Sequence, residues 1–321
     1  MNKVKLEDVA KHANVSPTTV SRVINNRGSL SDKTKAKVFQ SMEELGYYPN
    51  EIARSLFGKK THSIGILFPD LINPFFGEMV TKLENLLADL DYKVLICNTN
   101  NDFDKETKYL KMLLANQVDG IIVGSHNKPN KIYQQTNLPI VAIDRFVSES
   151  VPIIRSDNYQ GACLATNYLI QKGCRKIALI SGSTEEEVNN GEQRAKGYFD
   201  TLRENDLPET CFLVEFDKSI DYQKERIQQF LIDYPDIDGV FVTGDAIAAL
   251  LLHTAQQFNR NLEIVGYDGT QFVLNYFNQF PTVRQPTDEM ASKTIDVLFQ
   301  FINGNYENAG KEFLFKTTLV E

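Results

Sequence analysis

The segment LEDVAKHANVSPTTVSRVINN, residues 6–26, decides how the N-terminal part of the chain folds. Its first apolar residues share one helical face and are Leu6, Val9, Ala10 and Ala13. Asn14 then interrupts the pattern, and Asn tolerates the left-handed backbone of a tight turn between helices. Ser16 and Pro17 begin a second helix, because a hydroxyl can cap the free amides and proline suits the first helical position.

The second expected helix has a short polar face that is suited to DNA. Its inward residues are Val20, Val23 and Ile24, and its outward residues are Thr18, Thr19, Ser21, Arg22 and Asn25. A helix in the major groove needs side chains that donate to and accept from base edges, and arginine best matches guanine. We therefore predict a recognition helix. The alternative is a solvated face, which usually carries Glu and Lys instead.

A third helix begins near Ser31 and Asp32, buries Val38, Met42 and Leu45, and stops at Gly46. Three helices within about 45 residues are typical of a helix-turn-helix unit.

Residues 51–57 form a further helical pattern, but an isolated helix of about two turns is marginal in water. We expect it to order when it pairs with its twin on DNA. Leu56 would then act as an apolar wedge in the minor groove. The alternative is that Leu56 packs on the headpiece.

The formal net charge of −8 hides an uneven distribution along the chain. Residues 1–60 carry 11 Lys and Arg against 6 Asp and Glu, whereas the remaining residues carry 23 against 36. A basic segment before an acidic body indicates a phosphate-binding module attached to a domain that does not bind nucleic acid. An accidental surface imbalance is the alternative.

The chain has no feature of a secreted or membrane protein. Its longest purely apolar stretch is 246–252, too short for a bilayer span, and its N-terminus lacks the apolar core of a signal peptide. The four cysteines lack CxxC spacing, which argues against a disulfide framework or a zinc ribbon. We expect a cytoplasmic protein without metal, cofactor or membrane partner.

From Ser63 onward, buried-strand patterns alternate with amphipathic helices, which predicts parallel sheets. The expected strands are 64–68, 93–97, 120–123, 140–143, 153–155, 177–180, 239–242 and 262–265. They suit an α/β core of two doubly wound lobes, like a periplasmic binding protein, behind an all-α headpiece. The expected domains are a headpiece at 1–48, a hinge helix and linker at 49–60, and a core at 61–321. The expected N-terminal lobe takes 61–157 and 287–315, and the C-terminal lobe takes 158–282 and the end of the chain.

Four of these strand patterns are followed within three residues by a carboxylate, and ligands bind at the carboxyl ends of strands in open α/β sheets. The four residues are Asp70, Asp144, Asp245 and Asp268. Carboxylates accept from hydroxyl groups, an arginine such as Arg194 donates, and an aromatic face from Phe75, Phe76 or Tyr267 can stack. The set predicts a site for a polyhydroxylated ligand, although each Asp alone could be an ordinary helix cap.

Signals for catalysis are sparse. The sequence holds no GxSxG, P-loop, GxGxxG or HExxH motif, and His12, His62, His126 and His253 are far apart. Carboxylates near a cleft could serve acid–base chemistry, but without a nucleophile, metal cluster or cofactor loop, binding is the better interpretation. We expect a binding protein and not an enzyme.

The segment at 6–26, together with YYPNEIARSLFGKKTHSIGILFPDLINPFFGE at 47–78, resembles the LacI/GalR family of bacterial repressors. The likeness continues through VDGIIV, AIDR, TGDAIAA, IVGYDG and TVRQP, so it covers nearly the whole chain. The body motifs are shared with periplasmic sugar-binding proteins. Within the family, the phrases SPTTVSRVINNRG, IRSDN and GYDGT resemble those of sucrose operon repressors of low-GC Gram-positive bacteria.

This resemblance implies a homodimer on double-stranded operator DNA, with two recognition helices on the half-sites of a pseudo-palindrome. By position, Pro17, Thr18 and Arg22 are implied to read bases. The full set of expected DNA-binding residues at this helix is Ser16, Pro17, Thr18, Thr19, Ser21, Arg22 and Asn25. The implied minor-groove residues are Asn50, Ala53 and Leu56. A sugar or sugar-phosphate effector closes the lobes, so that the hinge helices no longer dock and operator affinity falls. The sign is a hypothesis, because some family members bind DNA with a corepressor.

By position, Asp144, Arg194, Asp245 and Asp268 match ligand-contacting residues of the family. Two positions depart from its pattern. Gly244 stands where many members have a side-chain amide. Lys218 lies near a position where several members have a stacking aromatic residue, and a lysine there admits a phosphorylated ligand. The alternatives are a regulator of another sugar, a global carbon-catabolite regulator, a transport-type sugar-binding protein without DNA function and, last, a sugar-converting enzyme.

Overall fold

The computed structural model describes residues 4–25, 27–48, 60–115, 118–124, 131–182 and 192–321. The chain divides into two units, Met1–Thr61 and His62–Glu321. The first holds α1 (Leu6–His12), α2 (Pro17–Ile24) and α3 (Asp32–Leu45). Their shared core consists of Val9, Ala10, Ala13, Val20, Val23 and Val38. The helix-turn-helix prediction is therefore confirmed.

The turn residues of this unit behave as their chemistry predicts. Asn14 has a φ of 48°, the left-handed conformation expected between α1 and α2. The Ser16 hydroxyl caps α2 by accepting a hydrogen bond of 3.1 Å from the backbone N–H of Thr19. Gly46 ends α3 with a φ of 61°, which glycine adopts without strain.

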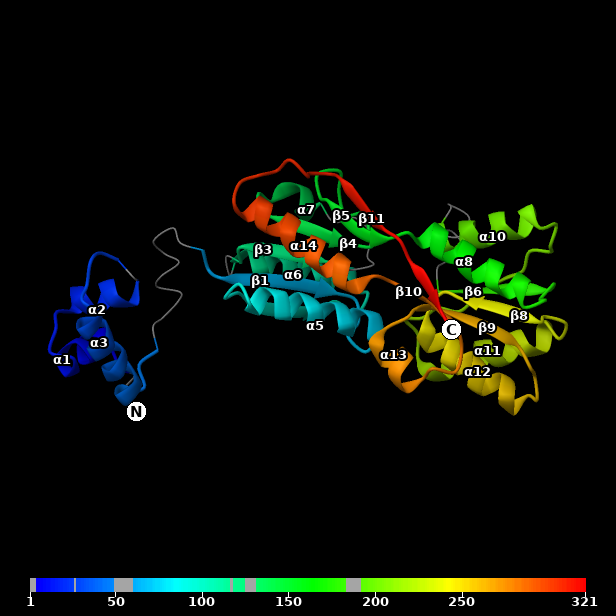
Figure 1. Ribbon diagram of the computed structural model, residues 1–321, viewed down its shortest axis with the longest axis horizontal. Helices are drawn as coiled ribbons and strands as arrows, with labels where there is room; N and C mark the ends of the chain where they lie inside the picture. The colour runs from blue at the N-terminus through cyan, green and yellow to red at the C-terminus, as the bar shows by residue number, and fades with distance from the viewer. Residues whose placement is uncertain (1–3, 26, 49–59, 116–117, 125–130, 183–191) are drawn as a thin grey trace. The chain divides into compact units, whose positions relative to one another are not determined.

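The second unit contains two six-stranded sheets, each with helices on both faces (Figure 1). The first sheet, in the N-terminal lobe, is parallel throughout, in the order β11-β5-β4-β3-β1-β2. Its strands are β1 (Ser63–Phe68), β2 (Lys93–Asn98), β3 (Gly120–Val123), β4 (Ile140–Ile143), β5 (Ile153–Ser156) and β11 (Glu312–Phe315). One face is covered by α5 (Pro74–Ala88) and α14 (Thr287–Ile302), the other by α6 (Phe103–Ala115) and α7 (Ile132–Gln135).

The second sheet, in the C-terminal lobe, has the order β12-β10-β9-β8-β6-β7, with only β12 antiparallel. Its strands are β6 (Ile177–Ser181), β7 (Cys211–Leu213), β8 (Gly239–Val242), β9 (Glu263–Asp268), β10 (Thr282–Arg284) and β12 (Thr318–Val320). One face is covered by α8 (Asn158–Gln171) and α10 (Gln193–Glu204). The other is covered by α11 (Ile220–Asp233), α12 (Asp245–Gln257) and α13 (Gln271–Tyr276).

The chain passes between the lobes three times: after β5, after β10 and after β11. Side chains tie these crossings together. The Ser156 hydroxyl donates to Gln285 Oε1 at 2.6 Å. Gln160 Oε1 accepts from both the backbone N–H and the hydroxyl of Thr317, at 3.1 and 2.7 Å. The two lobes are thus joined by hydrogen-bonded crossings. In the described part of the chain, no helix has the length and apolar character needed to cross a bilayer.

Candidate effector site and nucleic-acid interface

Arg194, in the first turn of α10, is the centre of a polar cluster at the carboxyl ends of the strands. Its Nε donates to Asn158 Oδ1 at 2.8 Å, and its NH1 donates to the backbone carbonyl of Thr243 at 2.8 Å. The guanidinium lies 3.8 Å from the centroid of the Tyr267 ring, close enough for a cation–π contact. These contacts fix the orientation of the guanidinium.

The same guanidinium faces Asp144, which follows β4 of the N-terminal lobe, with NH2 3.9 Å from Oδ2. Asn158 Nδ2 donates to Asp144 Oδ1 at 3.0 Å, while its own Oδ1 accepts from the Tyr267 hydroxyl at 3.0 Å. The lobes therefore meet in one hydrogen-bonded group.

Asp268 extends this group, since it accepts a hydrogen bond of 2.8 Å from Gln285 Nε2. We call the whole set the strand-end cluster, made of Asp144, Asn158, Arg194, Tyr267, Asp268 and Gln285. Asp144 and Asp268 have φ angles of 61° and 116°, in the region that favours glycine. Strained backbone of this kind collects at ligand sites, where the surrounding structure holds it.

Burial sets the charges of the cluster. Burial alone would lower the pKa of Arg194, but Tyr267, Asp268 and Asp144 raise it, and the net shift is upward. Arg194 is therefore a permanent cation. Burial raises the pKa of Asp268, and Asp144 adds to that rise, while Arg194 and Gln285 oppose it. A fixed donor fork beside carboxylates can bind several hydroxyl groups at once.

Asp245, which we expected to contact the ligand, is buried, with 3% of its surface exposed. Both of its carboxylate oxygens bind protein groups: the Thr282 hydroxyl at 2.6 Å and the backbone N–H of Gly269 at 2.8 Å. It thereby connects the start of α12 to β9 and β10. Burial raises the pKa of Asp245, and the nearby Asp268 raises it further.

We predict that Asp245→Asn changes how stability depends on pH. Because the pKa of Asp245 is higher in the folded chain, its stabilising effect is complete below the unfolded value of about 4 and is lost as pH rises through the folded value. For each pH unit between the unfolded and the folded pKa, the wild type is expected to lose about 1.4 kcal/mol of unfolding free energy relative to the variant. Urea unfolding between pH 5 and 8 measures the difference. The exposed Asp217→Asn is the control and is expected to track the wild type.

Three predicted residues lie in the N-terminal lobe: Asp70 in the segment that leads into α5, and Phe75 and Phe76 in the first turn of α5. Asp70 accepts a hydrogen bond of 2.8 Å from the backbone N–H of Ile72. Phe75 and Phe76 are buried in the lobe's core, where the Phe76 ring lies 5.4 Å from that of Phe68. Both phenyl rings therefore pack in the core in this structure. Tyr267 is likewise fully buried under Arg194.

A partly exposed aromatic side chain near the strand ends was missed by the sequence analysis. Phe216 lies so close to Gly244 that a Cβ added there would come within 3.1 Å of its ring, and one added at Gly182 within 2.5 Å. Phe216 thus occupies the space beside these two glycines, after β6 and β8. Lys218, two residues on, pairs with Glu215 at 3.6 Å. The aromatic side chain beside Gly182 and Gly244 is therefore Phe216.

In the headpiece, α2 presents the polar face that the sequence predicts. Pro17, Thr18 and Arg22 are exposed. Asn25 caps the end of the helix and its Nδ2 donates to the Ser21 carbonyl at 2.7 Å. The predicted minor-groove residues Asn50, Ala53 and Leu56 lie outside the described residues.

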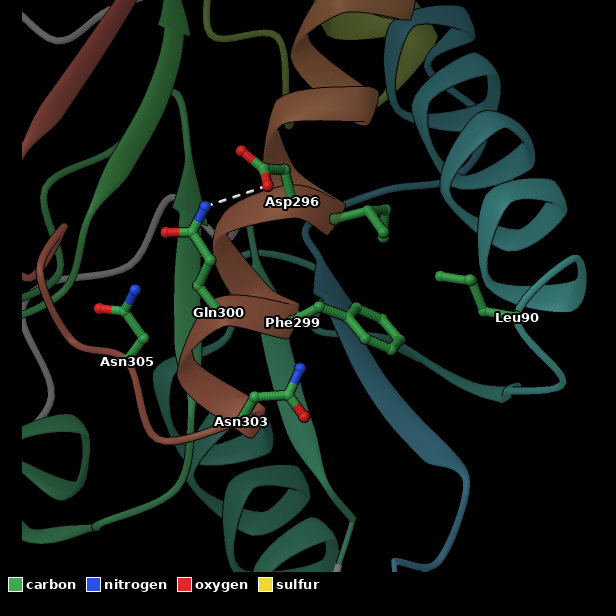
Figure 2. A pocket seen from close by; sticks show the side chains of 7 residues that line it. Leu90, Asp296, Phe299, Gln300, Asn303 and Asn305 are labelled. Carbon is green, nitrogen blue, oxygen red and sulfur yellow. Dashed lines mark hydrogen bonds between the residues drawn. The ribbon is translucent and has the colours of Figure 1, made fainter.

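A hollow of about 490 Å³ lies on the N-terminal lobe, beside α14. Figure 2 shows the side chains that line it. It is lined by Leu90, Ile295, Asp296, Phe299, Gln300, Asn303 and Asn305. None of the residues predicted to bind an effector lines it, so it is separate from the strand-end cluster. Within the described ranges, no group of three His, Cys, Asp or Glu side chains is arranged to hold a metal ion.

Comparisons with known proteins agree with this architecture. Residues 5–50 match the model described as "Bacterial regulatory proteins, lacI family", and 61–295 match "Periplasmic binding proteins and sugar binding domain of LacI family". The chain is 44% identical to a sucrose operon repressor of Pediococcus pentosaceus over 94% of this chain and 93% of the relative. It is 41% identical to one from Lactococcus lactis subsp. lactis, over 94% of each chain.

Among solved structures, the lac repressor dimer bound to operator and the anti-inducer ONPF is similar, with a TM-score of 0.84 and 25% identity. That likeness covers 100% of this chain and 98% of the other. The headpiece and the sugar-binding core are thus both matched by models of the same family. The chain belongs to the LacI family of DNA-binding, sugar-responsive repressors, which are not enzymes.

Proposed function

We propose that this protein represses a sucrose-utilisation operon and leaves its operator when sucrose binds at the strand-end cluster. The observation that carries the proposal is the group of Arg194, Asp144 and Asn158, which brings a fixed cation, a carboxylate and an amide from two lobes to one place. The identity of 44% to a sucrose operon repressor supports the choice of sugar.

The charges of the cluster favour a neutral sugar over a sugar phosphate. Asp144 and Asp268 lie beside the single guanidinium, so a phosphate dianion would meet two carboxylates. Lys218 is paired with Glu215. Phe216 supplies an aromatic face for stacking on a sugar ring.

On the DNA side, we propose a homodimer whose two α2 helices take successive half-sites of a pseudo-palindrome. The proposed organisation is a headpiece at 1–48, a hinge at 49–60 and an effector-binding core at 61–321. Asn50, Ala53 and Leu56 remain the proposed minor-groove residues. Sucrose binding favours one arrangement of the lobes, and operator affinity falls because that arrangement opposes hinge docking.

The test is operator binding by the pure protein at fixed salt, with DNA from upstream of its own gene, titrated with sucrose, fructose and their phosphates. Release by sucrose alone is the expected result. Specific binding that none of the four changes would keep the repressor and remove sucrose. No specific binding would favour a sugar-binding protein without DNA function.

A further inference from the structure

A second polar connection joins the lobes through residues that do not belong to the strand-end cluster. Glu78, on α5 of the N-terminal lobe, accepts a hydrogen bond of 2.7 Å from the backbone N–H of Gln271. Gln271 is the first residue of α13, in the C-terminal lobe. The helices α5 and α13 lie side by side where the lobes meet (Figure 1).

The carboxylate of Glu78 is held from its own lobe by two further groups. The Thr287 hydroxyl, at the start of α14, donates to Glu78 Oε1 at 2.6 Å. Lys82 Nζ lies 3.0 Å from the same oxygen, donates to the Thr287 hydroxyl at 2.7 Å and pairs with Asp288 at 2.8 Å. The side chains of Glu78 and Lys82 are 12% and 18% exposed, so water screens this pair only partly.

The electrostatics fit a permanent carboxylate. Burial raises the pKa of Glu78, but hydrogen bonds from Thr287, Gln271 and Lys82 lower it, and the net shift is downward. Beside these contacts, α5 and α13 are separated by a groove of about 410 Å³. Its other lining residues include Ile72, Pro74, Gly77, Thr81 and Phe272. The hydrogen bond of Glu78 therefore joins the two helices at the edge of this groove.

We propose that Glu78, Lys82 and Thr287 form a clasp that holds α13 against the N-terminal lobe and favours the lobe arrangement seen here. The Gln271 amide must leave Glu78 whenever the two helices separate. A ligand that contacts both lobes through the strand-end cluster needs them together. The clasp therefore raises effector affinity from outside the site, and this last step rests on the proposed function.

Hydrogen exchange of the full-length protein without effector tests the clasp. Glu78→Ala is expected to speed amide exchange by about tenfold or more across 270–276 and at the crossing 285–287, while β8 stays unchanged. Glu84→Gln, which alters an exposed carboxylate on the same helix, is the control and is expected to match the wild type. Unchanged exchange, or an increase confined to the Gln271 amide, would overturn the proposal.

Glu78→Gln guards against a folding defect, because it keeps the side chain's shape and an acceptor oxygen. It is expected to shift exchange in the same direction by a smaller factor, with an unchanged thermal unfolding midpoint. Sucrose affinity is expected to fall about threefold or more in Glu78→Ala. If the wild type does not bind sucrose, the proposed function fails, and the exchange rates still decide the clasp. If sucrose binds the wild type and Glu78→Ala equally, the clasp has no effect on the site.

Discussion

Arg22→Ala is expected to lower specific operator affinity by at least about 30-fold, because a bidentate arginine–guanine contact discriminates by about 1–3 kcal/mol and a dimer makes two of them. Arg22 is exposed on α2, on the helix face that the Ser16 cap and the buried Val20 and Val23 orient outward. The measurement is a titration of operator and of random DNA at the same salt concentration.

Lys33→Ala is the matched control, since it removes one exposed positive charge from α3 of the same unit. Removing a residue that contacts only phosphate weakens binding to every DNA sequence alike and reduces the salt dependence of binding. For Arg22, the operator is therefore expected to lose much more affinity than random DNA. An equal loss for both DNAs would show that Arg22 contacts the backbone and does not read bases.

Arg194→Ala is expected to remove the response to sucrose, with effector affinity falling by about 100-fold or more, since hydrogen bonds to charged groups are each worth about 1.5–3 kcal/mol. The change leaves Asp144 and Asn158 without their cation and uncovers the Tyr267 ring. Operator binding without sugar is expected to stay within a few-fold of wild type, because the headpiece has its own core. Sucrose titration of the operator complex measures both quantities.

Arg203→Ala is the control on the same helix, because Arg203 is mostly exposed and pairs with Asp200 and Glu209 at the surface. It is expected to leave the sucrose response unchanged. Loss of a buried cation can also destabilise the core, so thermal unfolding and the conservative Arg194→Lys accompany the test. A folded Arg194→Ala protein that sucrose still releases from DNA would remove the cluster as the effector site.

The sequence predicted the long elements of the fold well, because their patterns are strong. The Ser16–Pro17 start and the Gly46 stop of the headpiece helices have local chemical causes that tertiary packing does not override. The eight expected strands all occur, although β9 extends to Asp268. The strands β7, β10, β11 and β12 were not among them. Three of these strands have only three residues, and β11 alternates exposed and half-buried residues without a continuous buried apolar run.

The site residues predicted at the strand ends were carboxylates, and two amide side chains of the site were therefore not among them. Asn158 follows β5 by two residues, and Gln285 directly follows β10. The same rule of strand ends, applied to amide side chains, would have found both. Phe216 follows no expected strand, and only the fold shows that it lies beside Gly182 and Gly244.

Phe75 and Phe76 carried a signal for the core that the search for a stacking surface overlooked. Phe75, Met79 and Leu83 recur at helical spacing after the Pro74 start of α5, and Phe76, Val80 and Leu83 do the same. All five are buried in the core of the N-terminal lobe. Apolar periodicity that follows a helix start indicates core packing more strongly than ligand contact.

We propose that sucrose and operator bind to opposing states of one protein, and thermodynamic linkage tests this proposal directly. The measurement is the sucrose affinity of the free protein and of the operator complex, at the same salt and pH. Sucrose is expected to bind the operator complex more weakly than the free protein, by the same factor by which saturating sucrose lowers operator affinity. Equal sucrose affinities, or tighter binding to the operator complex, would contradict it.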